Sequence, residues 1–363
     1  LLSAGRRPEP RLDDGFTYWQ HSHAPRDDWP PGTHAYADWL REQGQSLDDL
    51  RDSPERVTPE YHQTKWASDC AIDFISQDHH DRPWLLNINV YDPHPPFIPP
   101  EAYARRFKAE DMPGPHFRMS DLKQQKSLEA VDFQRGARRP EELNIQDAQA
   151  KYYAMIAQID DQLARILSAL DTTGQTDNTV IIFTSDHGEM LGDHGLMFKG
   201  CRFYEGLVRV PLIFSGPEPI KRNLQCSGLV ELLDMSATIL ALSGTEMPEH
   251  HQGRNLMPVL TGEASGESIR QSVRCEYFDA LDSSFTGGTG SYATMYRNDR
   301  YKLCLYHTQG LGELYDLSED PWEFNNLWVV PTYERIKHQM ILDSFNNHVN
   351  LTTNVGSRRI APM

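Results

Sequence analysis

The residues best suited to chemistry follow an apolar run. Residues 179–184 are mostly β-branched, aliphatic or aromatic, and Asp186 and His187 come almost directly after them. This composition predicts a strand buried on both faces, and open parallel sheets bind ligands just beyond the carboxyl ends of such strands. An adjacent carboxylate and imidazole can reach one divalent cation here, because Gly188 relaxes the backbone. Lys199 then supplies a mobile positive charge for an anionic substrate.

A lone Asp-His pair also has a plainer interpretation, in which Asp186 caps a helix and His187 is an ordinary loop histidine. The longer string of motifs favours the first interpretation. It reads, in order, Ser185-Asp-His-Gly-Glu189, Gly192-Asp-His-Gly195, Lys199, Tyr204-Glu-Gly206 and Arg209-Val-Pro-Leu-Ile213. This order strongly resembles the sulfatase family of the alkaline phosphatase superfamily.

The resemblance implies specific roles for three residues. In that family the aspartate and its Asn or His neighbour are two ligands of a divalent cation, which implies that role for Asp186 and His187. The lysine that follows contacts the sulfate or phosphonate group, which implies that Lys199 binds substrate and takes part in catalysis. Calcium is the expected ion because its oxygen-rich sites suit most of the family, while His187 leaves manganese as an alternative.

A second candidate region lies upstream. Residues 84–90 predict another buried strand, and the Pro-rich segment Tyr91–Phe97 follows it. This segment resembles the family's Asp-Pro-His segment, whose histidine touches the ester group, so His94 is expected to bind substrate and act in catalysis. Either His94 or Lys199 could protonate the leaving alcohol. Taken alone, His94 would be a histidine in a Pro-rich turn.

Three further residues are candidate substrate contacts. Tyr18 and Trp19 lie in an aromatic, His- and Pro-rich segment on which a sugar could stack, although loop aromatics that merely pack are commoner. Arg202 is expected to be exposed after a glycine and to reach the leaving group. Glu205 and Arg209 are expected to brace the loop instead of touching substrate.

The family's nucleophile has no match in this sequence. It is a cysteine or serine in Cys-x-Pro-x-Arg or Cys-x-Ala-x-Arg, converted to formylglycine, and none of the five cysteines has that context. The family's paired aspartates after a first strand also lack a match, since the residues before Asp13-Asp14 do not form a strand pattern. Leu1–Gly5 resembles the point after the family's Gly-Lys-x-His segment. We therefore expect formylglycine upstream of this chain.

Helix patterns alternate with apolar runs through the first 265 residues. A helix is predicted to follow Thr58-Pro59, as N-cap and first helical residue, with its core face formed by Trp66, Cys70 and Phe74. Apolar residues spaced by three or four predict a longer helix over 152–170. The alternation predicts an α/β fold, with a mostly parallel sheet sandwiched between helices.

The rest of the chain divides into three patterns. Residues 110–143 show no clear period and predict a long excursion over the active-site face. Residues 210–214 predict a strand, and 229–242 a helix. Beyond residue 265, sequential short strands without crossover helices predict a small antiparallel sheet, over 272–278, 291–296 and 301–306. A terminal helix is predicted over 332–347. We therefore assign residues 1–265 to an N-terminally incomplete sulfatase-like α/β domain and residues 266–363 to an α+β subdomain.

Composition excludes several other classes. A length of 363 residues suits one large domain with an appendage, and a net charge of −17 argues against nucleic-acid and anionic-membrane binding. No apolar run approaches the roughly 20 residues of a membrane helix, so membrane insertion is not expected. Five cysteines without C-x-x-C spacing argue against a zinc knuckle or a disulfide framework. The compartment stays open, with periplasmic, secreted or lysosomal favoured by the resemblance.

The resemblance implies a sulfatase that hydrolyses sulfate esters, with a sulfated small molecule or saccharide as its partner. The implied mechanism is metal-assisted and uses formylglycine. A phosphonate monoester or phosphodiester hydrolase of the same superfamily is the alternative, because a histidine beside the metal-binding aspartate also occurs in phosphonate monoester hydrolases. A non-catalytic remnant that binds a sulfated ligand is the third interpretation.

Overall fold

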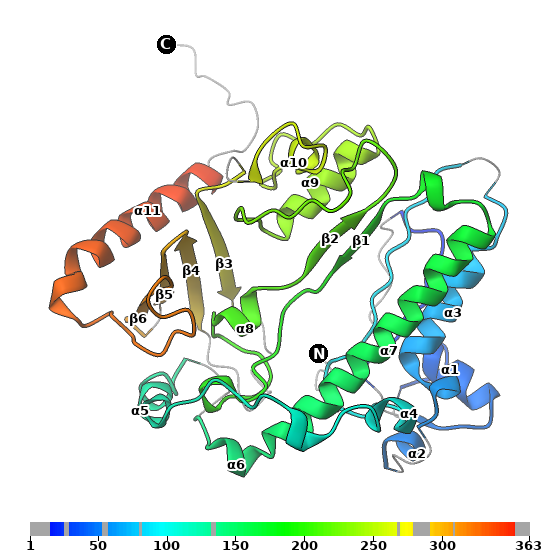
Figure 1. Ribbon diagram of the computed structural model, residues 1–363, viewed down its shortest axis with the longest axis horizontal. Helices are drawn as coiled ribbons and strands as arrows, with labels where there is room; N and C mark the ends of the chain where they lie inside the picture. The colour runs from blue at the N-terminus through cyan, green and yellow to red at the C-terminus, as the bar shows by residue number, and fades with distance from the viewer. Residues whose placement is uncertain are drawn as a thin grey trace. The chain divides into compact units, whose positions relative to one another are not determined.

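The computed structural model describes residues 15–24, 29–52, 57–79, 82–131, 136–266, 269–278, 291–307 and 309–352 (Figure 1). Asp13 and Asp14 lie outside these residues. The chain divides into two compact units. Unit 1 comprises residues 1–115 and 139–178, and unit 2 comprises residues 116–138 and 179–363. The domain boundary predicted near residue 265 lies inside unit 2 and stays a prediction.

Unit 1 is helical in its described residues, with a long helix α7 (Ile145–Thr172) beside α3 (Gln63–Ile75). An ion pair joins Arg165 of α7 to Asp69 of α3 at 2.6 Å. Its core is aromatic and aliphatic, and Tyr36, Leu40 and Trp66 are buried in it. The other helices are α1 (Ala35–Glu42), α2 (Leu47–Asp52), α4 (Glu101–Ala104) and α6 (Pro140–Leu143).

The helix predicted around Trp66 is confirmed, but its start is not at Thr58-Pro59. Those residues open a short 3-10 turn, Pro59–Tyr61, and the Thr58 side chain makes no capping hydrogen bond. The N-cap of α3 is His62, whose Nδ1 accepts a hydrogen bond from the Thr64 N–H at 3.3 Å. An imidazole nitrogen thus provides the acceptor that a helix start requires.

The strand predicted over residues 84–90 is not found. The segment pairs with no strand in the described part of the chain, and Leu85 is 60% exposed. Burial instead alternates along it, as in an extended chain with two different sides. Apolar, β-prone composition favours an extended backbone, but a strand also needs a partner to complete its hydrogen bonds.

The helix predicted over residues 152–170 is confirmed as the carboxyl-terminal part of α7. Its predicted core stripe is only partly buried, since Ile156 and Leu167 are 44% and 40% exposed. The buried face includes Met155 and Leu170 of that stripe together with Ala154, Gln158 and Gln162. Small and medium-sized side chains allow the close approach of α3 and α4, which pack on this helix.

Unit 2 contains a two-stranded antiparallel ladder, β1 (Ile181–Thr184) with β2 (Leu212–Ser215). The expected parallel sheet is not present among the described residues, and β1 is half-buried along its length, not covered on both faces. For β2 to pair parallel to β1, the chain between them would need a long crossover connection, usually a helix. Between the two strands the described helices are a 3-10 turn over Asp193–Gly195 and α8 (Glu205–Val208), which has only four residues.

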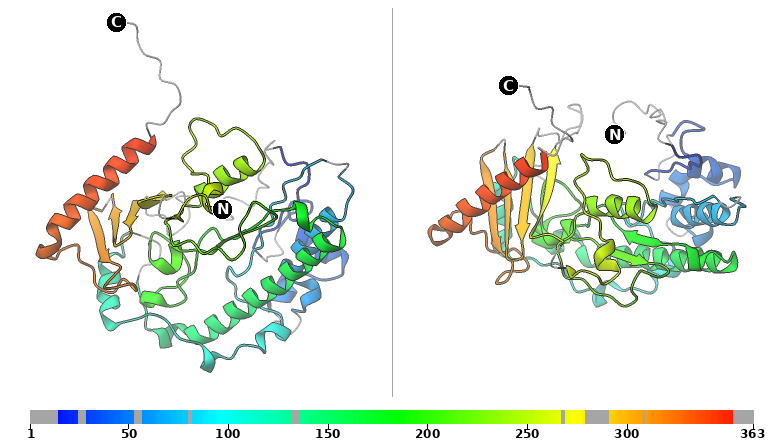
Figure 2. Two further views of the ribbon diagram at one scale, coloured as in Figure 1. Left: turned by 45° about the horizontal axis from the view of Figure 1, so that its top comes forward. Right: turned by 90° about the horizontal axis from the view of Figure 1, so that it is seen from above.

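The antiparallel sheet predicted near the carboxyl end is confirmed and gains a strand. It is a meander in the order β3 (Ser272–Phe278), β4 (Tyr292–Asn298), β5 (Tyr301–Tyr306) and β6 (Leu311–Asp316). The terminal helix α11 (Glu334–Thr352) lies along this sheet (Figure 2), and its Met340 packs with Leu303 and Leu314. The described part of unit 2 also contains α5 (Met119–Ser127), α9 (Leu233–Leu242) and α10 (Met257–Leu260).

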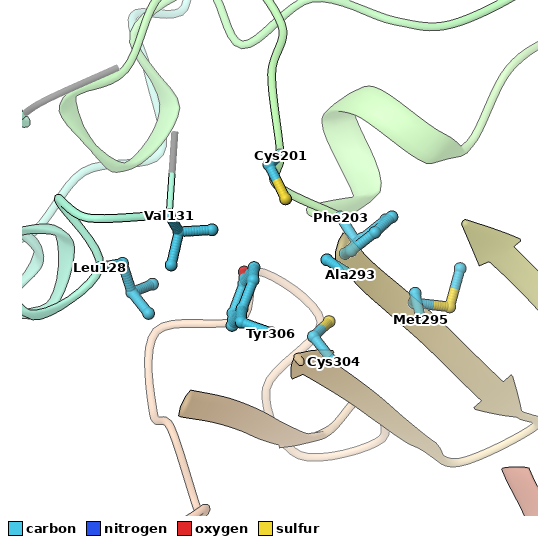
Figure 3. Close-up of a cluster of buried hydrophobic side chains, with 8 residues drawn as sticks. All are labelled: Leu128, Val131, Cys201, Phe203, Ala293, Met295, Cys304 and Tyr306. Atoms are coloured by element: carbon cyan, nitrogen blue, oxygen red, sulfur yellow. The ribbon is translucent and has the colours of Figure 1, made fainter. Parts of the chain in front are cut away.

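A buried apolar cluster in unit 2 joins the sheet to the loop between β1 and β2 (Figure 3). Cys201 and Phe203 of the loop lie in it with side chains of β4 and β5. The remaining members are Leu128 and Val131, which follow α5, together with Ala293 and Met295 of β4 and Cys304 and Tyr306 of β5. All five cysteines of the chain have free thiols. No described helix has the combination of length and apolar character needed to cross a membrane.

Candidate functional site

The site is built on the turn that follows β1. The His187 N–H donates to Asp186 Oδ1 at 2.9 Å, and the Ser185 hydroxyl donates to the His187 carbonyl at 2.8 Å. These bonds hold the two side chains together, with His187 Nε2 3.6 Å from Asp186 Oδ2. The Asp186 side chain is 84% exposed and that of His187 37%. The predicted pair therefore shares one accessible position.

The tautomer of His187 follows from its neighbour. Nδ1 lies 2.8 Å from the Gly188 carbonyl oxygen, which can only accept, so Nδ1 carries the proton. In the neutral ring Nε2 would then present its lone pair on the side of Asp186. A carboxylate oxygen and a neutral imidazole nitrogen are both donors for a divalent cation, so this pair fits part of a metal site. The described residues contain no group of three or more His, Cys, Asp or Glu arranged to hold a metal.

Lys199 is placed by the carboxylate of Glu189. The Phe198 N–H donates to Glu189 Oε1, and the Leu191 N–H donates to the same oxygen at 3.4 Å. Phe198 adopts a left-handed backbone with φ of 66°, so this clamp holds a conformation that the residue rarely adopts. Burial lowers the pKa of Lys199, while the carboxylates of Asp186 and Glu189 act in the opposite direction. Asp186 and Lys199 are thus close enough to interact.

One cavity of about 1410 Å³ brings the unit 2 candidates together. Asp186, His187 and Lys199 all line it, as does Arg209. Much of its remaining wall is apolar and includes Leu212, Phe214, Val230, Leu256, Val259 and Met295. A few acidic and basic side chains beside a largely apolar wall are typical of a site that binds a small molecule.

Arg202 does not occupy the exposed position that the sequence predicted. It is 2% exposed, and its guanidinium donates to Gln125 Oε1 at 3.1 Å and to the Leu128 carbonyl at 3.1 Å. The expected exposure is not found because the chain after Gly200 turns inward, carrying Cys201 into the buried cluster of Figure 3. Arg202 still lines the same cavity as Lys199, and its contact with the leaving group stays a prediction. In this structure Arg202 ties the loop to α5.

Glu205 braces the loop as expected, through ion pairs with Lys302 at 2.6 Å and Arg297 at 2.9 Å. Arg209 differs from this expectation, since it is exposed and lines the cavity. A signal for it was available. It precedes β2, and the pairing of Thr184 with Leu212 puts the start of β2 at the end of β1 from which Asp186 emerges.

Residues Asp193–Tyr204 of the loop between β1 and β2 are fixed by buried polar and ring contacts. Asp193 Oδ1 accepts the His116 N–H at 2.7 Å, and the His194 ring stacks on Tyr204 with centroids 3.9 Å apart. The Tyr204 hydroxyl donates to Glu313 Oε1 at 3.1 Å. Burial raises the pKa of Tyr204 well above its usual value. These residues support the loop from within.

Unit 1 carries His94 in a proline-rich turn. Its Nδ1 lies 2.6 Å from the Pro95 carbonyl oxygen, which can only accept, so Nδ1–H donates this bond. The ring packs on Tyr91 with centroids 4.7 Å apart, and Tyr91 in turn contacts His23 at 6.0 Å. The neighbouring Asp92 accepts a hydrogen bond from the Thr64 hydroxyl at 2.5 Å, which ties the turn to α3. A substrate role for His94 stays a prediction.

Tyr18 and Trp19 have different surroundings in unit 1. Tyr18 packs on Phe74 of α3 with centroids 5.3 Å apart, and its hydroxyl donates to the Cys70 carbonyl at 3.4 Å. This placement matches the packing alternative for Tyr18. Trp19 is 49% exposed and stacks near His21. Their contacts with substrate stay predictions.

Comparison with known families places these motifs in context. A model of the sulfatase family matches residues 13–245, which is more than half of the chain. The chain belongs to the sulfatase family. A second model, for the C-terminal part of N-sulphoglucosamine sulphohydrolase, matches residues 192–347 of this sulfatase-family chain.

The relatives of this sulfatase-family chain include proteins named for different activities. The multifunctional alkaline phosphatase superfamily protein PehA of Trinickia caryophylli is 32% identical over 320 residues, covering 81% of this chain and 61% of PehA. An arylsulfatase of Clostridium perfringens is 28% identical over 305 residues, covering 80% and 61%. The chain thus spans about three fifths of the length of these curated relatives. The crystal structure of the phosphonate monoester hydrolase of Agrobacterium radiobacter matches with a TM-score of 0.74 at 26% identity, covering 89% of this chain and 70% of that one.

Proposed function

We propose that this chain carries the metal-binding and sulfate-binding part of a hydrolase that cleaves sulfate esters of a carbohydrate. The observation that carries the proposal is the convergence of Asp186, His187 and Lys199 on one cavity. Membership of the sulfatase family supports the reaction class. The match to the C-terminal model of N-sulphoglucosamine sulphohydrolase supports a sulfated sugar as the substrate class.

The roles of the residues follow from their chemistry. Asp186 and His187 would hold a divalent cation, with calcium as the first choice and manganese favoured by the imidazole. When bound, such a cation withdraws charge from the group being transferred. The Lys199 ammonium offers up to three N–H donors to sulfate oxygens, which carry the negative charge of the substrate.

His94 is proposed as a second contact for the ester group. The proton on Nδ1 is held by the Pro95 carbonyl, so Nε2 can accept a hydrogen bond or, once protonated, give a proton to the leaving alcohol. The nucleophile is proposed to be a formylglycine supplied by residues outside this sequence, because none of the five cysteines has the required context. This assignment is testable at the level of the gene.

A phosphonate monoester hydrolase is the second candidate. Two observations favour it, namely the imidazole of His187 beside Asp186 and the structural likeness at 26% identity to a phosphonate monoester hydrolase. An imidazole ligand favours a transition metal such as Mn²⁺ over Ca²⁺, and the metal's preferred geometry then affects how the ester group is held. The two candidates share the same residues and differ in substrate preference.

The first experiment is to determine the residues encoded upstream of Leu1. A Cys-x-Pro-x-Arg or Cys-x-Ala-x-Arg motif there supports hydrolysis, and its absence leaves a non-catalytic protein that binds sulfated ligands. The second is a direct comparison of aryl sulfate and aryl phosphonate ester turnover by the full-length gene product. A higher kcat/KM for the sulfate supports the proposal, and a higher kcat/KM for the phosphonate supports the second candidate.

A further inference from the structure

The backbone beside the Asp186–His187 pair makes an unusually close contact with α8. The Gly188 N–H donates to the Leu207 carbonyl at 2.8 Å. A Cβ atom added to Gly188 would lie 1.9 Å from the Gly206 carbonyl oxygen and 3.2 Å from Leu207 Cα. No side chain can be placed at position 188 unless one of the two backbones moves.

The contact leaves no room for a side chain at Gly188 but does leave room for one at Gly206. A Cβ atom added to Gly206 would have Asp193 Oδ2 as its nearest neighbour, at 3.4 Å, which is an ordinary contact distance. Only Gly188 is therefore restricted by the lack of space. Neither glycine is required here for a left-handed backbone, because neither has a positive φ. The two positions thus form a matched pair for substitution.

The helix on the other side of this contact is anchored to the four-stranded sheet. Glu205, the first residue of α8, forms ion pairs with Lys302 of β5 at 2.6 Å and with Arg297 of β4 at 2.9 Å. Its backbone N–H donates to Glu323 Oε2 at 2.7 Å. Lys302 is fully buried and also pairs with Glu323 at 2.7 Å and donates to the Phe203 carbonyl at 2.8 Å. These ion pairs tie α8 to the sheet, because removing one partner would leave a buried charge without compensation.

We propose that the four-stranded sheet positions the Asp186–His187 pair through α8 and the Gly188 contact. The inference rests on the proposed function, in which this pair holds a cation. Relief of a 1.9 Å approach to at least 3.0 Å requires a shift of about 1 Å at Gly188. Metal–ligand distances tolerate only about 0.2 Å.

The imidazole is coupled directly to this shift. His187 Nδ1–H donates to the carbonyl of Gly188 itself, so movement of Gly188 moves the acceptor that fixes both the tautomer and the orientation of the ring. Groups that orient a metal-binding histidine typically alter metal affinity by about 10- to 100-fold when they are removed. Gly188 and Glu205 are therefore positioning residues, which act through His187 without touching the substrate.

The test is metal affinity, measured by titration calorimetry with Ca²⁺ and with Mn²⁺ on the full-length gene product. Gly188→Ala is expected to weaken binding by at least about 10-fold. Gly206→Ala, the matched control, is expected to stay within about 3-fold of wild type, because its Cβ meets no close neighbour. Equal affinities for Gly188→Ala and wild type would overturn the inference and leave the proposed function intact. A wild-type protein that binds neither ion would overturn both.

A second pair of variants keeps the inference testable where Gly188→Ala does not fold. Glu205→Gln removes the charge that pairs with Lys302 and Arg297 and keeps the side-chain shape. It is expected to weaken metal binding by about 3- to 10-fold and to shift the ring ¹⁵N signals of His187. Arg300→Gln removes the Arg300–Asp316 ion pair of the same sheet, which does not involve α8, and both readouts should stay unchanged. Equal effects of the two variants, or none from Glu205→Gln, would overturn the inference.

Discussion

The loop from Ser185 to Arg209 in unit 2 and the segment from Arg82 to Phe97 in unit 1 each carry a predicted substrate contact, and they are held in different ways. The loop is fixed by buried ion pairs and close backbone contacts with α8. The unit 1 segment runs extended into a proline-rich turn, where His94 packs on Tyr91. Removing one partner of a buried ion pair strongly destabilises the fold, because the remaining charge is left desolvated. A ring contact contributes only about 0.5–1.5 kcal/mol, so the first region should be far more sensitive to substitution.

The largest expected effect is from Lys302→Met. It leaves Glu205 and Glu323 buried without their shared cation, and it should lower the free energy of unfolding by about 3–5 kcal/mol. Urea unfolding followed by tryptophan fluorescence measures it. Arg300→Gln is the control, since Arg300 is 54% exposed in its pair with Asp316 and should change stability by less than about 1 kcal/mol. Similar losses in the two variants would show that the buried ions of the loop are no more sensitive than an exposed pair.

Lys199→Ala tests the chemistry of the loop, not its stability. Loss of a preorganised cation at the sulfate should lower kcat/KM for an aryl sulfate by about 10²- to 10³-fold, with little change in the unfolding midpoint. Steady-state kinetics on the full-length gene product provide the measurement. Lys151→Ala on the exposed face of α7 is a suitable control, because it breaks only a surface pair with Asp147. An unchanged rate would remove Lys199 from the proposed mechanism.

Unit 1 should respond to pH through His34, which caps α1. Its Nδ1 accepts the Ala37 N–H at 3.1 Å, and burial lowers its pKa from 6.5 to about 4, with His21 and His23 adding to the effect. The unfolded chain therefore binds a proton between pH 6.5 and 4 that the folded chain does not, and stability should fall across this window as the pH falls. The loss should be on the order of 3 kcal/mol.

The matched variant for this pH effect is His34→Asn, which keeps a capping acceptor and removes the titration. Unfolding curves collected from pH 7 to pH 4 should be flatter for the variant than for wild type. Curves of equal slope would show that other groups set the acid sensitivity of the protein.

The smallest expected effect is from Tyr18→Phe. The ring keeps its contact with Phe74, and only the long hydrogen bond to the Cys70 carbonyl is lost, so stability should change by less than about 1 kcal/mol. The KM for a saccharide sulfate should stay unchanged if Tyr18 only packs on α3. An increase in KM would instead support the substrate contact that the sequence predicted.

The sequence predicted those parts of the molecule that depend on local pattern. The antiparallel strands beyond residue 265, the long helix that became α7 and the adjacency of Asp186 and His187 all follow from short-range composition and order. Partners distant in sequence were not predictable in this way. Nothing near Arg202 indicates that its donors reach Gln125 and Leu128, and nothing near Lys302 indicates its pairing with Glu205. Strand direction also escaped prediction, because β-prone residues favour an extended chain but do not select its neighbour.

The distribution of the five thiols gives this protein a natural attachment point for an optical reporter. Cys201 and Cys304 are buried, and burial raises the pKa of Cys70, of Cys275 to about 11, and of Cys304 well above its usual value. Cys226 alone among the five is exposed. Because maleimides react with accessible thiolates, Cys226 should be labelled first at neutral pH. Since it lines the same cavity as Asp186 and Lys199, a dye placed there would report on occupancy of that cavity without any engineered residue.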